Sequence, residues 1–80
     1  MPPLFNKIAI AGVGLIGGSF GMVVRESGIA VKVIGLGRNP EKLERAKYLN
    51  AIDDWSTDIK SGLQDADLVY IATPVNNIID

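Results

Sequence analysis

The sequence predicts an α/β fold, in which a parallel sheet of strand order 3-2-1-4 carries helices on both of its faces. The first observation behind this prediction is that apolar, β-branched runs alternate along the chain with segments of helical periodicity. The second is a glycine-rich turn between the first apolar run and the first helical segment. The third is that no repeat, low-complexity tract or linker interrupts the alternation. Such alternation is typical of parallel strands joined by right-handed crossovers.

The first strand is expected at Lys7–Gly12, a short apolar run closed by glycine, as in a strand buried on both faces. A helix is expected over Leu15–Ser27, with Gly28 at its C-terminal cap. The apolar residues that recur at helical spacing in this segment are Ile16, Phe20, Val23 and Val24.

A second strand is expected at Val31–Leu36, which is rich in β-branched residues. The next helix is expected to start with Asn39 as N-cap and Pro40 at its first position, and to run to about Asn50. On its outer face, Glu41 and Arg45 stand one turn apart.

The rest of the chain continues the same alternation. A short third strand is expected at Ala51–Trp55 and a short helix at Thr57–Leu63. Asp67–Thr73 reads as a fourth strand that Pro74 ends, and a further helix is expected from Val75 to Asp80. The domain is therefore expected to be incomplete within these 80 residues.

Composition limits the functions that the chain can have. With no cysteine and no histidine, disulfides, thiolate nucleophiles, the usual zinc ligands and histidine catalysis are excluded within the chain. A net charge of −1 argues against a nucleic-acid surface. No apolar run is long enough to span a membrane, because glycines interrupt the run from Ile8 to Gly18. A cytoplasmic location is expected.

The segment Gly12–Gly17 matches the pattern G-x-G-x-x-G, with a strand before it and a helix after it. Gly12 permits the tight turn, Gly14 lets a pyrophosphate approach the backbone, and Gly17 lets helix and strand pack closely. The first N–H groups of the helix then face the pyrophosphate. This context predicts a Rossmann-like dinucleotide-binding site. The alternative is a glycine-rich turn without a ligand.

The end of the second strand bears on the choice between NAD and NADP. Enzymes that prefer NAD usually carry Asp or Glu there, whereas this chain has Gly37 followed by Arg38. A missing carboxylate removes repulsion against a 2′-phosphate, and a guanidinium can bind that phosphate. The sequence therefore favours NADP slightly. The alternative is that Arg38 is a solvated loop residue and that NAD is used.

The loop after the fourth strand is expected to lie beside the nicotinamide half of the cofactor, because ligands bind beyond the carboxyl ends of strands in this fold. Thr73 offers a hydroxyl group there and Pro74 stiffens the loop. The alternative is that Pro74 only terminates the strand.

Taken together, these motifs resemble the prephenate and arogenate dehydrogenase family of tyrosine biosynthesis. The matching segments are Gly12–Ser19, Ile34–Glu41, Ala51–Asp53 and Ala66–Val75, in the order that the family has them. The resemblance implies oxidative decarboxylation of prephenate to 4-hydroxyphenylpyruvate, or of arogenate, with hydride transfer to NAD or NADP. Alternatives are another NAD(P)-dependent reductase, such as a pyrroline-carboxylate reductase, or a non-catalytic module that senses dinucleotides.

The resemblance also implies roles for single residues. Those expected at the pyrophosphate are Gly12, Gly14, Leu15, Ile16 and Gly17. Those expected at the adenosine ribose are Arg38 and Asn39, while Gly37 departs from the aspartate of NAD-preferring members. Those expected at the nicotinamide side are Thr73 and Pro74.

The resemblance finally implies which domain of the intact enzyme carries each function. Residues 1–80 are expected to form part of the NAD(P)-binding domain, and a C-terminal domain outside this chain is expected to bind substrate and form a homodimer. No catalytic residue and no metal ligand is assigned here, and the 80 residues alone are expected to be inactive. The partner of the intact enzyme is expected to be a small-molecule substrate, with no nucleic acid and no membrane.

Overall fold

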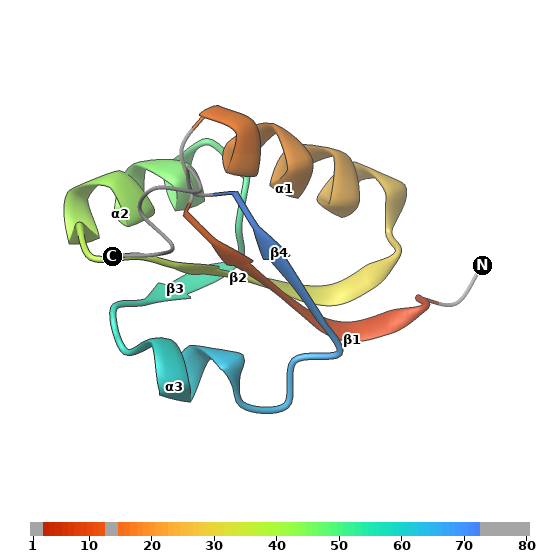
Figure 1. Cartoon of the computed structure of the whole chain (residues 1–80). Coiled ribbons are helices and arrows are strands. Elements are labelled where there is room, and N and C mark those ends of the chain that lie inside the picture. Colours follow the sequence, from red (N-terminus) through yellow and green to blue (C-terminus); the bar gives the residue numbers. More distant parts are fainter. Residues whose placement is uncertain (1–2, 13–14, 73–80) are drawn as a thin grey trace.

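The computed structural model describes residues 3–12 and 15–72, without the side chains of residues 15 and 16. Four parallel strands form one sheet of order β3-β2-β1-β4, which confirms the predicted order. Helices α1 and α2 cover one face of the sheet and α3 the other (Figure 1). In chain order the elements are β1 (Phe5–Ala11), α1 (Leu15–Ser27), β2 (Ala30–Leu36), α2 (Pro40–Tyr48), β3 (Asp54–Ser56), α3 (Ile59–Leu63) and β4 (Leu68–Ile71).

The strands all run in one direction, so their carboxyl ends meet at one edge of the sheet. In the β1 register, Ala11 lies beside Leu36 on one side and beside Ile71 on the other. Leu36 in turn lies beside Ser56 of β3. Ligands of open α/β sheets bind beyond this carboxyl edge, and the predicted site residues follow it directly.

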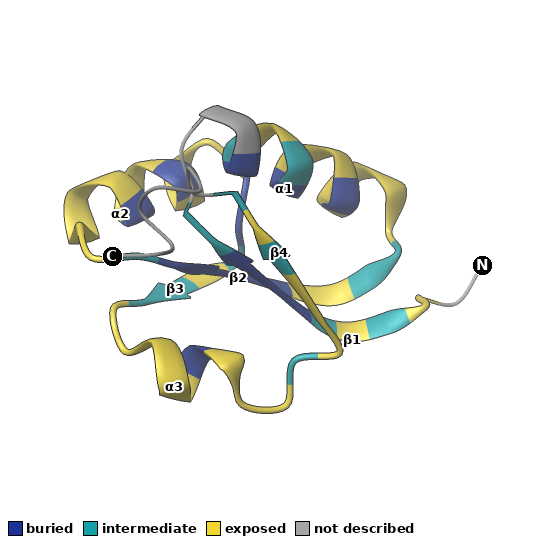
Figure 2. Cartoon of the chain, viewed as in Figure 1, coloured by how far each residue is buried: buried dark blue, intermediate teal, exposed yellow. Residues whose placement is uncertain are grey.

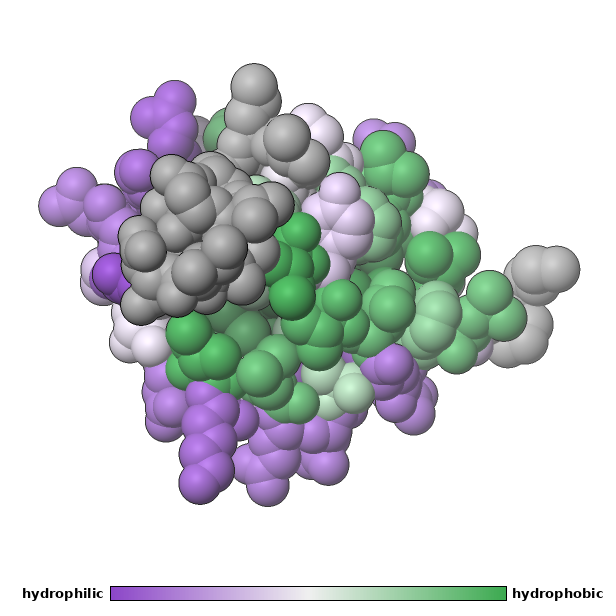
Figure 3. Space-filling model, in the orientation of Figure 1, coloured by the Kyte–Doolittle hydropathy of each residue, from purple (hydrophilic) through white to green (hydrophobic). Residues whose placement is uncertain are grey.

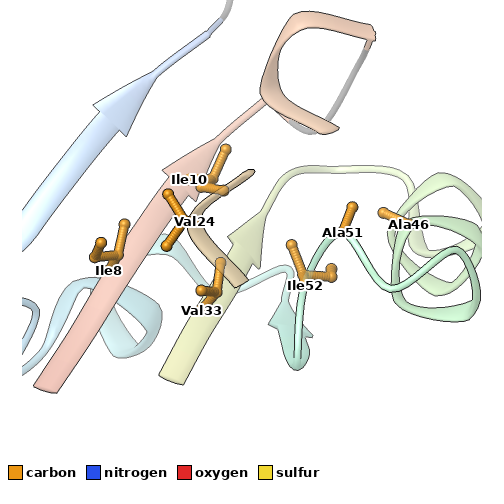
Figure 4. Packing of buried hydrophobic residues seen from close by; sticks show 7 residues of the cluster. All are labelled: Ile8, Ile10, Val24, Val33, Ala46, Ala51 and Ile52. Carbon is orange, nitrogen blue, oxygen red and sulfur yellow. The ribbon is translucent and has the colours of Figure 1, made fainter. Parts of the chain in front are cut away.

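The larger part of the core lies between the sheet and helices α1 and α2. Its members converge from both strands and helices (Figure 4), and burial is concentrated in β1 and β2 (Figure 2). Each fully buried aliphatic side chain contributes about 1.5–3 kcal/mol to folding. The buried members are Ile8, Ile10, Val24, Val33, Ala46, Ala51 and Ile52.

The opposite face carries a smaller buried cluster. Because side chains alternate along a strand, Ala9 points away from Ile8 and Ile10 and packs with Ile34 and Leu36. Helix α3 covers this cluster at Gly62, where a Cβ atom would overlap the side chain of Leu36. Glycine at this position therefore lets a five-residue helix lie directly on the sheet.

Helix α1 has both of the termini that the sequence predicts, and α2 has the predicted amino end. Helix α1 spans Leu15–Ser27, and Gly28 follows it at φ +72°, in the left-handed region that favours glycine. Asn39 caps α2: its Oδ1 accepts hydrogen bonds from the N–H of Glu41 (3.0 Å) and of Lys42 (3.4 Å). Pro40 occupies the first helical position, where its missing N–H costs nothing.

The connection between α2 and β3 differs from the prediction. Helix α2 ends at Tyr48, and the third strand is Asp54–Ser56 instead of Ala51–Trp55. Asn50 takes a left-handed conformation (φ 63°), and the N–H of the next residue bonds back to the carbonyl of Ala46. Residues 51 and 52 are thereby directed into the core, so their apolar character reflects burial in a loop and not a strand.

Other boundaries shift by one or more residues. The first strand is Phe5–Ala11, the second Ala30–Leu36 and the fourth Leu68–Ile71. The short helix begins only at Ile59, because Asp58 caps it by accepting from the N–H of Ser61. Of the apolar residues that recur at helical spacing in α1, Val24 is buried, whereas Val23 is 63% exposed.

Two carboxylates close the amino edge of the sheet in the same way. Asp53 donates its N–H to the carbonyl of Val33 and accepts the N–H of Val33 with Oδ2 (2.7 Å). Asp67 donates its N–H to the carbonyl of Lys7 and accepts the N–H of Asn6 with Oδ2 (2.6 Å). Each of these carboxylates accepts the N–H of a residue in the adjacent strand, just before the point at which β3 or β4 starts to pair with it.

Candidate functional site

The turn after β1 has the geometry that the glycine pattern requires at its first position. Gly12 adopts φ +88°, which L residues with a side chain rarely take. Its N–H donates to the carbonyl of Leu36 (2.9 Å), which fixes the end of β1 against β2. Helix α1 starts three residues later, at Leu15. Val13 and Gly14 lie outside the described residues.

The third glycine of the pattern brings α1 onto the end of β1. A Cβ atom at Gly17 would overlap the carbonyl oxygen of Gly12 and would lie 3.2 Å from both the Ala72 Cβ and the Ile10 Cγ2. The backbone oxygen cannot move away without breaking the turn. Only glycine therefore permits this approach, which is the packing role expected of Gly17.

The sequence analysis did not single out Gly21, which has a similar role one turn further along α1. A Cβ atom there would overlap the carbonyl oxygen of Ala51 and would lie 3.1 Å from the Ile10 Cδ1. The signal that could have revealed it is its spacing of four residues from Gly17, which places both glycines on one helix face. Gly18, between them, has no heavy atom within 4 Å of such a Cβ.

The amino end of α1 provides a favourable electrostatic environment for an anion. The first N–H groups of a helix lack acceptors within the helix, and the helix dipole places positive charge there. No acidic residue occupies the first turn of α1. The backbone of Leu15 and Ile16 forms this turn.

Position 37, at the end of β2, does not need glycine for the fold. Gly37 is half-buried and is not among the described glycines with positive φ. A Cβ atom there would lie 3.6 Å from the Leu43 Cδ2, an ordinary van der Waals distance. A Cβ atom would thus be accepted, so the backbone conformation does not itself demand glycine at this position.

The amino end of α2, next to this position, has no unpaired backbone donor. Pro40 has no N–H, and Asn39 Oδ1 accepts from the next two residues. The N–H of Leu43 donates to the Asn39 carbonyl (3.2 Å). An anion at the end of β2 would therefore find no free N–H group in the first turn of α2. Arg38 is exposed and has no hydrogen bond or ion pair to another described residue.

The capping role also limits what Asn39 can offer a ligand. Its Oδ1 is already occupied by the helix, so only the Nδ2 amide group remains to donate a hydrogen bond. Asn39 is thus placed beside Arg38 as a structural cap with one free donor group.

The segment after β4 reaches the same edge. The N–H of Ala72 donates to the carbonyl of Ala11 (2.9 Å), so the chain leaves β4 directly beside the end of β1. The Cβ of Ala72 faces the position of Gly17. Thr73 and Pro74 follow it, outside the described residues, as does the helix predicted for Val75–Asp80. The structure thus brings to one edge the described parts of all three segments that the sequence analysis singled out.

The described site contains groups that bind rather than groups that transfer protons. It offers backbone amides, close-packed glycines and the guanidinium of Arg38. Within residues 3–12 and 15–72 no three potential metal-ligating side chains cluster. In the same part of the chain, no helix has the length and apolar content needed to cross a bilayer.

Comparisons with known proteins agree with this arrangement. The family model described as "Prephenate dehydrogenase, nucleotide-binding domain" matches residues 20–80. A prephenate dehydrogenase of Bacillus subtilis (strain 168) is 34% identical over 79 residues, which is 99% of this chain. That alignment includes the glycine pattern, which the family model's matched range does not.

Two solved structures share the fold. Prephenate dehydrogenase from A. aeolicus, solved in complex with hydroxyphenyl propionate and NAD+, is 35% identical with a TM-score of 0.82. Synechocystis arogenate dehydrogenase is 32% identical with a TM-score of 0.81. Each covers 91% of this chain. The chain spans only 21% of the length of the Bacillus protein, and 26% and 25% of the two solved chains.

Proposed function

The chain belongs to the prephenate dehydrogenase family as its nucleotide-binding domain, and on this basis we propose that it forms the cofactor-binding part of a prephenate or arogenate dehydrogenase. Its ligand is NAD or NADP. The observation that carries the proposal is the close approach of Gly17 in α1 to Gly12 in the turn, which any side chain at position 17 would prevent.

The residues of the carboxyl edge fit such a cofactor. Gly12 and Gly17 place the turn and the amino end of α1 where a pyrophosphate would bind. Arg38 and the free amide group of Asn39 lie at the end of β2, on the side proposed for the adenosine ribose. When bound, NAD(P)+ accepts a hydride from the substrate. This chain contributes binding and orientation, and we assign proton transfer and substrate binding to the rest of the enzyme.

We further propose that NADP is accepted and slightly preferred. A 2′-phosphate needs a nearby cation and no opposing carboxylate, and Gly37 and Arg38 satisfy both conditions. The first turn of α2 offers no free backbone amide for this phosphate, so we assign the charge-assisted part of its recognition to the guanidinium of Arg38.

Titration calorimetry with NADH and NADPH tests both the proposed cofactor binding and the proposed preference for NADP. The unsubstituted chain is expected to show saturable binding of both, and a failure to bind either would overturn the cofactor proposal. Arg38→Ala is expected to weaken NADPH binding about tenfold, as charge-assisted hydrogen bonds contribute roughly 1.5–3 kcal/mol, and to leave NADH binding unchanged. Arg45→Ala, an exposed arginine of α2, is the matched control. An unchanged NADPH-to-NADH ratio in Arg38→Ala would refute the phosphate role alone.

The remaining expectations concern the intact enzyme. We propose that it is a cytoplasmic homodimer whose partner is the small-molecule substrate, with no role for nucleic acid or membrane. The near-neutral net charge of −1 supports the absence of a nucleic-acid surface.

A further inference from the structure

Helix α2 is anchored along its inner face and exposed at its amino end. It has nine residues, a length at which an isolated helix is marginal in water. Its buried side chains are Leu43 and Ala46, and Glu44 Oε2 accepts a hydrogen bond from Trp55 Nε1 (2.6 Å). Residues 38–42 are all exposed, and Figure 3 shows hydrophilic side chains where α2 lies, at the left of the view. The first turn of α2 therefore depends on its cap more than on packing.

In the described part of the chain, Asn39 supplies every acceptor for the N–H groups of this first turn. Pro40 has no N–H. The Asn39 Oδ1 accepts from Glu41 and Lys42, and the Asn39 carbonyl accepts from Leu43 (3.2 Å). The backbone of Asn39 is extended (φ −105°, ψ 104°), as is usual for an N-cap. One residue thus determines how well the amino end of α2 is ordered.

Asn39 also lies at the proposed cofactor site. It follows Leu36, the last residue of β2, by three positions, and the Leu36 carbonyl accepts the N–H of Gly12 in the glycine turn (2.9 Å). In this fold the adenosine ribose is bound at the end of the second strand. Because Oδ1 is turned toward the helix, the Nδ2 group on the other side of the same amide is left for an acceptor outside it.

We propose that Asn39 couples cofactor binding to the order of α2. Its Nδ2 donates a hydrogen bond to the oxygen at the 2′ position of the adenosine ribose, which belongs to a hydroxyl in NAD(H) and to a phosphate in NADP(H). Its Oδ1 continues to cap the helix at the same time. This role rests on the proposed cofactor function and adds to it an effect of the nucleotide on the protein.

The two hydrogen-bonded ends of this amide favour each other. Ordering a side chain on binding normally costs conformational entropy, and the cap has already fixed Asn39 in one orientation. Conversely, a nucleotide that holds Nδ2 keeps Oδ1 on the N–H groups of Glu41 and Lys42, and linked hydrogen bonds polarise each other. By linkage, the cap strengthens nucleotide binding by the same factor by which the nucleotide strengthens the cap.

Amide hydrogen exchange measured by NMR tests the effect on α2. Saturating NADPH is expected to slow exchange of the Glu41 and Lys42 N–H groups by about fivefold, because these amides exchange when the cap opens locally. The N–H of Ser61 is the internal control. It donates to Asp58 Oδ1 in the cap of α3 (3.3 Å), away from the proposed ribose site, so its exchange should not change.

Asn39→Ser separates the two functions of the side chain, because serine caps helices about as well as asparagine but has no amide donor. We expect this variant to bind NADH about threefold and NADPH about tenfold more weakly in calorimetry, and to lose the slowing at Glu41 and Lys42. Asn39→Asp, which also caps and also lacks the donor, should lose the slowing by NADPH too. Asp58→Ser makes the same kind of change in the cap of α3 and should leave nucleotide binding unchanged.

The loss of affinity for both nucleotides distinguishes this role from that of Arg38, whose replacement is expected to affect NADPH alone. Unchanged binding of both nucleotides to Asn39→Ser would overturn the coupling, and so would equal slowing at Ser61. Slowing that persists in both Asn39 variants at saturation would overturn it as well, because the bound nucleotide would then only cover these amides. If the unsubstituted chain binds neither nucleotide, the cofactor proposal itself fails. Circular dichroism establishes that each variant is folded.

Discussion

Glycines that look equivalent in the sequence are required at their positions for different physical reasons. Gly12 is required by its positive φ, and Gly17 by the backbone oxygen that a Cβ atom would strike. Gly18 and Gly37 are required by neither. At Gly37 a Cβ atom would make only an ordinary contact with Leu43, so the fold alone does not explain this glycine.

Gly37→Asp is therefore expected to change cofactor preference with little effect on the fold. The new carboxylate can accept hydrogen bonds from ribose hydroxyls and repels a 2′-phosphate. We expect NADPH affinity to fall by about tenfold or more and NADH affinity to rise, with the unfolding free energy changed by less than about 1 kcal/mol. Calorimetry with both nucleotides and urea unfolding measure these quantities.

Gly37→Ala is the control for this substitution, since it adds the Cβ atom without the charge. It should leave the ratio of the two affinities near that of the natural chain. A strongly destabilised Gly37→Asp chain would contradict the statement that the fold tolerates a side chain at this position.

At the level of elements, α1 depends on small residues on its inner face. Gly17 and Gly21 let the helix backbone touch the ends of two other segments, while Val24 fills the core further along. Glycine inside a helix normally costs about 0.5–1 kcal/mol relative to alanine. The close contacts offset this cost at positions 17 and 21. At Gly18, no contact does so.

A pair of adjacent substitutions separates these effects. Gly17→Ala is expected to destabilise the chain by about 1–3 kcal/mol, the usual cost of overpacking. Gly18→Ala is expected to stabilise it by roughly 0.5–1 kcal/mol, because alanine loses less backbone entropy on folding. Urea unfolding followed by the fluorescence of Trp55, the only tryptophan, measures both. Equal effects of the two substitutions would contradict the proposed packing of α1.

At the level of the whole molecule, polar groups are used differently at the two edges of the sheet. Asp53 and Asp67 satisfy strand amides at the amino edge. Asp53 also forms an ion pair with Arg25 (3.0 Å), whose Nη1 donates to the carbonyl of Asn50 (2.9 Å). One guanidinium thus joins the end of α1 to the loop before β3. The amino edge is stabilised by these contacts, and the proposed cofactor site lies at the carboxyl edge.

Asp53→Ala is expected to lower the unfolding free energy by roughly 1–3 kcal/mol, because it removes the acceptor of the Val33 N–H and the partner of Arg25. Asp53→Asn keeps an oxygen acceptor and loses only the charge, so it should cost less. Glu26→Ala, an exposed carboxylate of α1, is the control. Urea unfolding of the three variants checks this order of unfolding free energies. A loss of stability as large in Glu26→Ala as in Asp53→Ala would contradict the structural role of Asp53.

The sequence by itself determined the element order, the 3-2-1-4 sheet, the caps at Gly28 and Asn39, and the position of the glycine turn. The element order, the caps and the turn follow from local propensity, periodicity and turn chemistry, which act over a few residues, and the sheet order was predicted from the Rossmann-like glycine pattern. Only the tertiary structure decided that residues 51 and 52 form a buried loop, that Val23 is exposed and that Gly21 is a packing glycine. Each of these depends on which distant segment lies opposite, because burial and close approach are set by contacts that the local sequence does not contain.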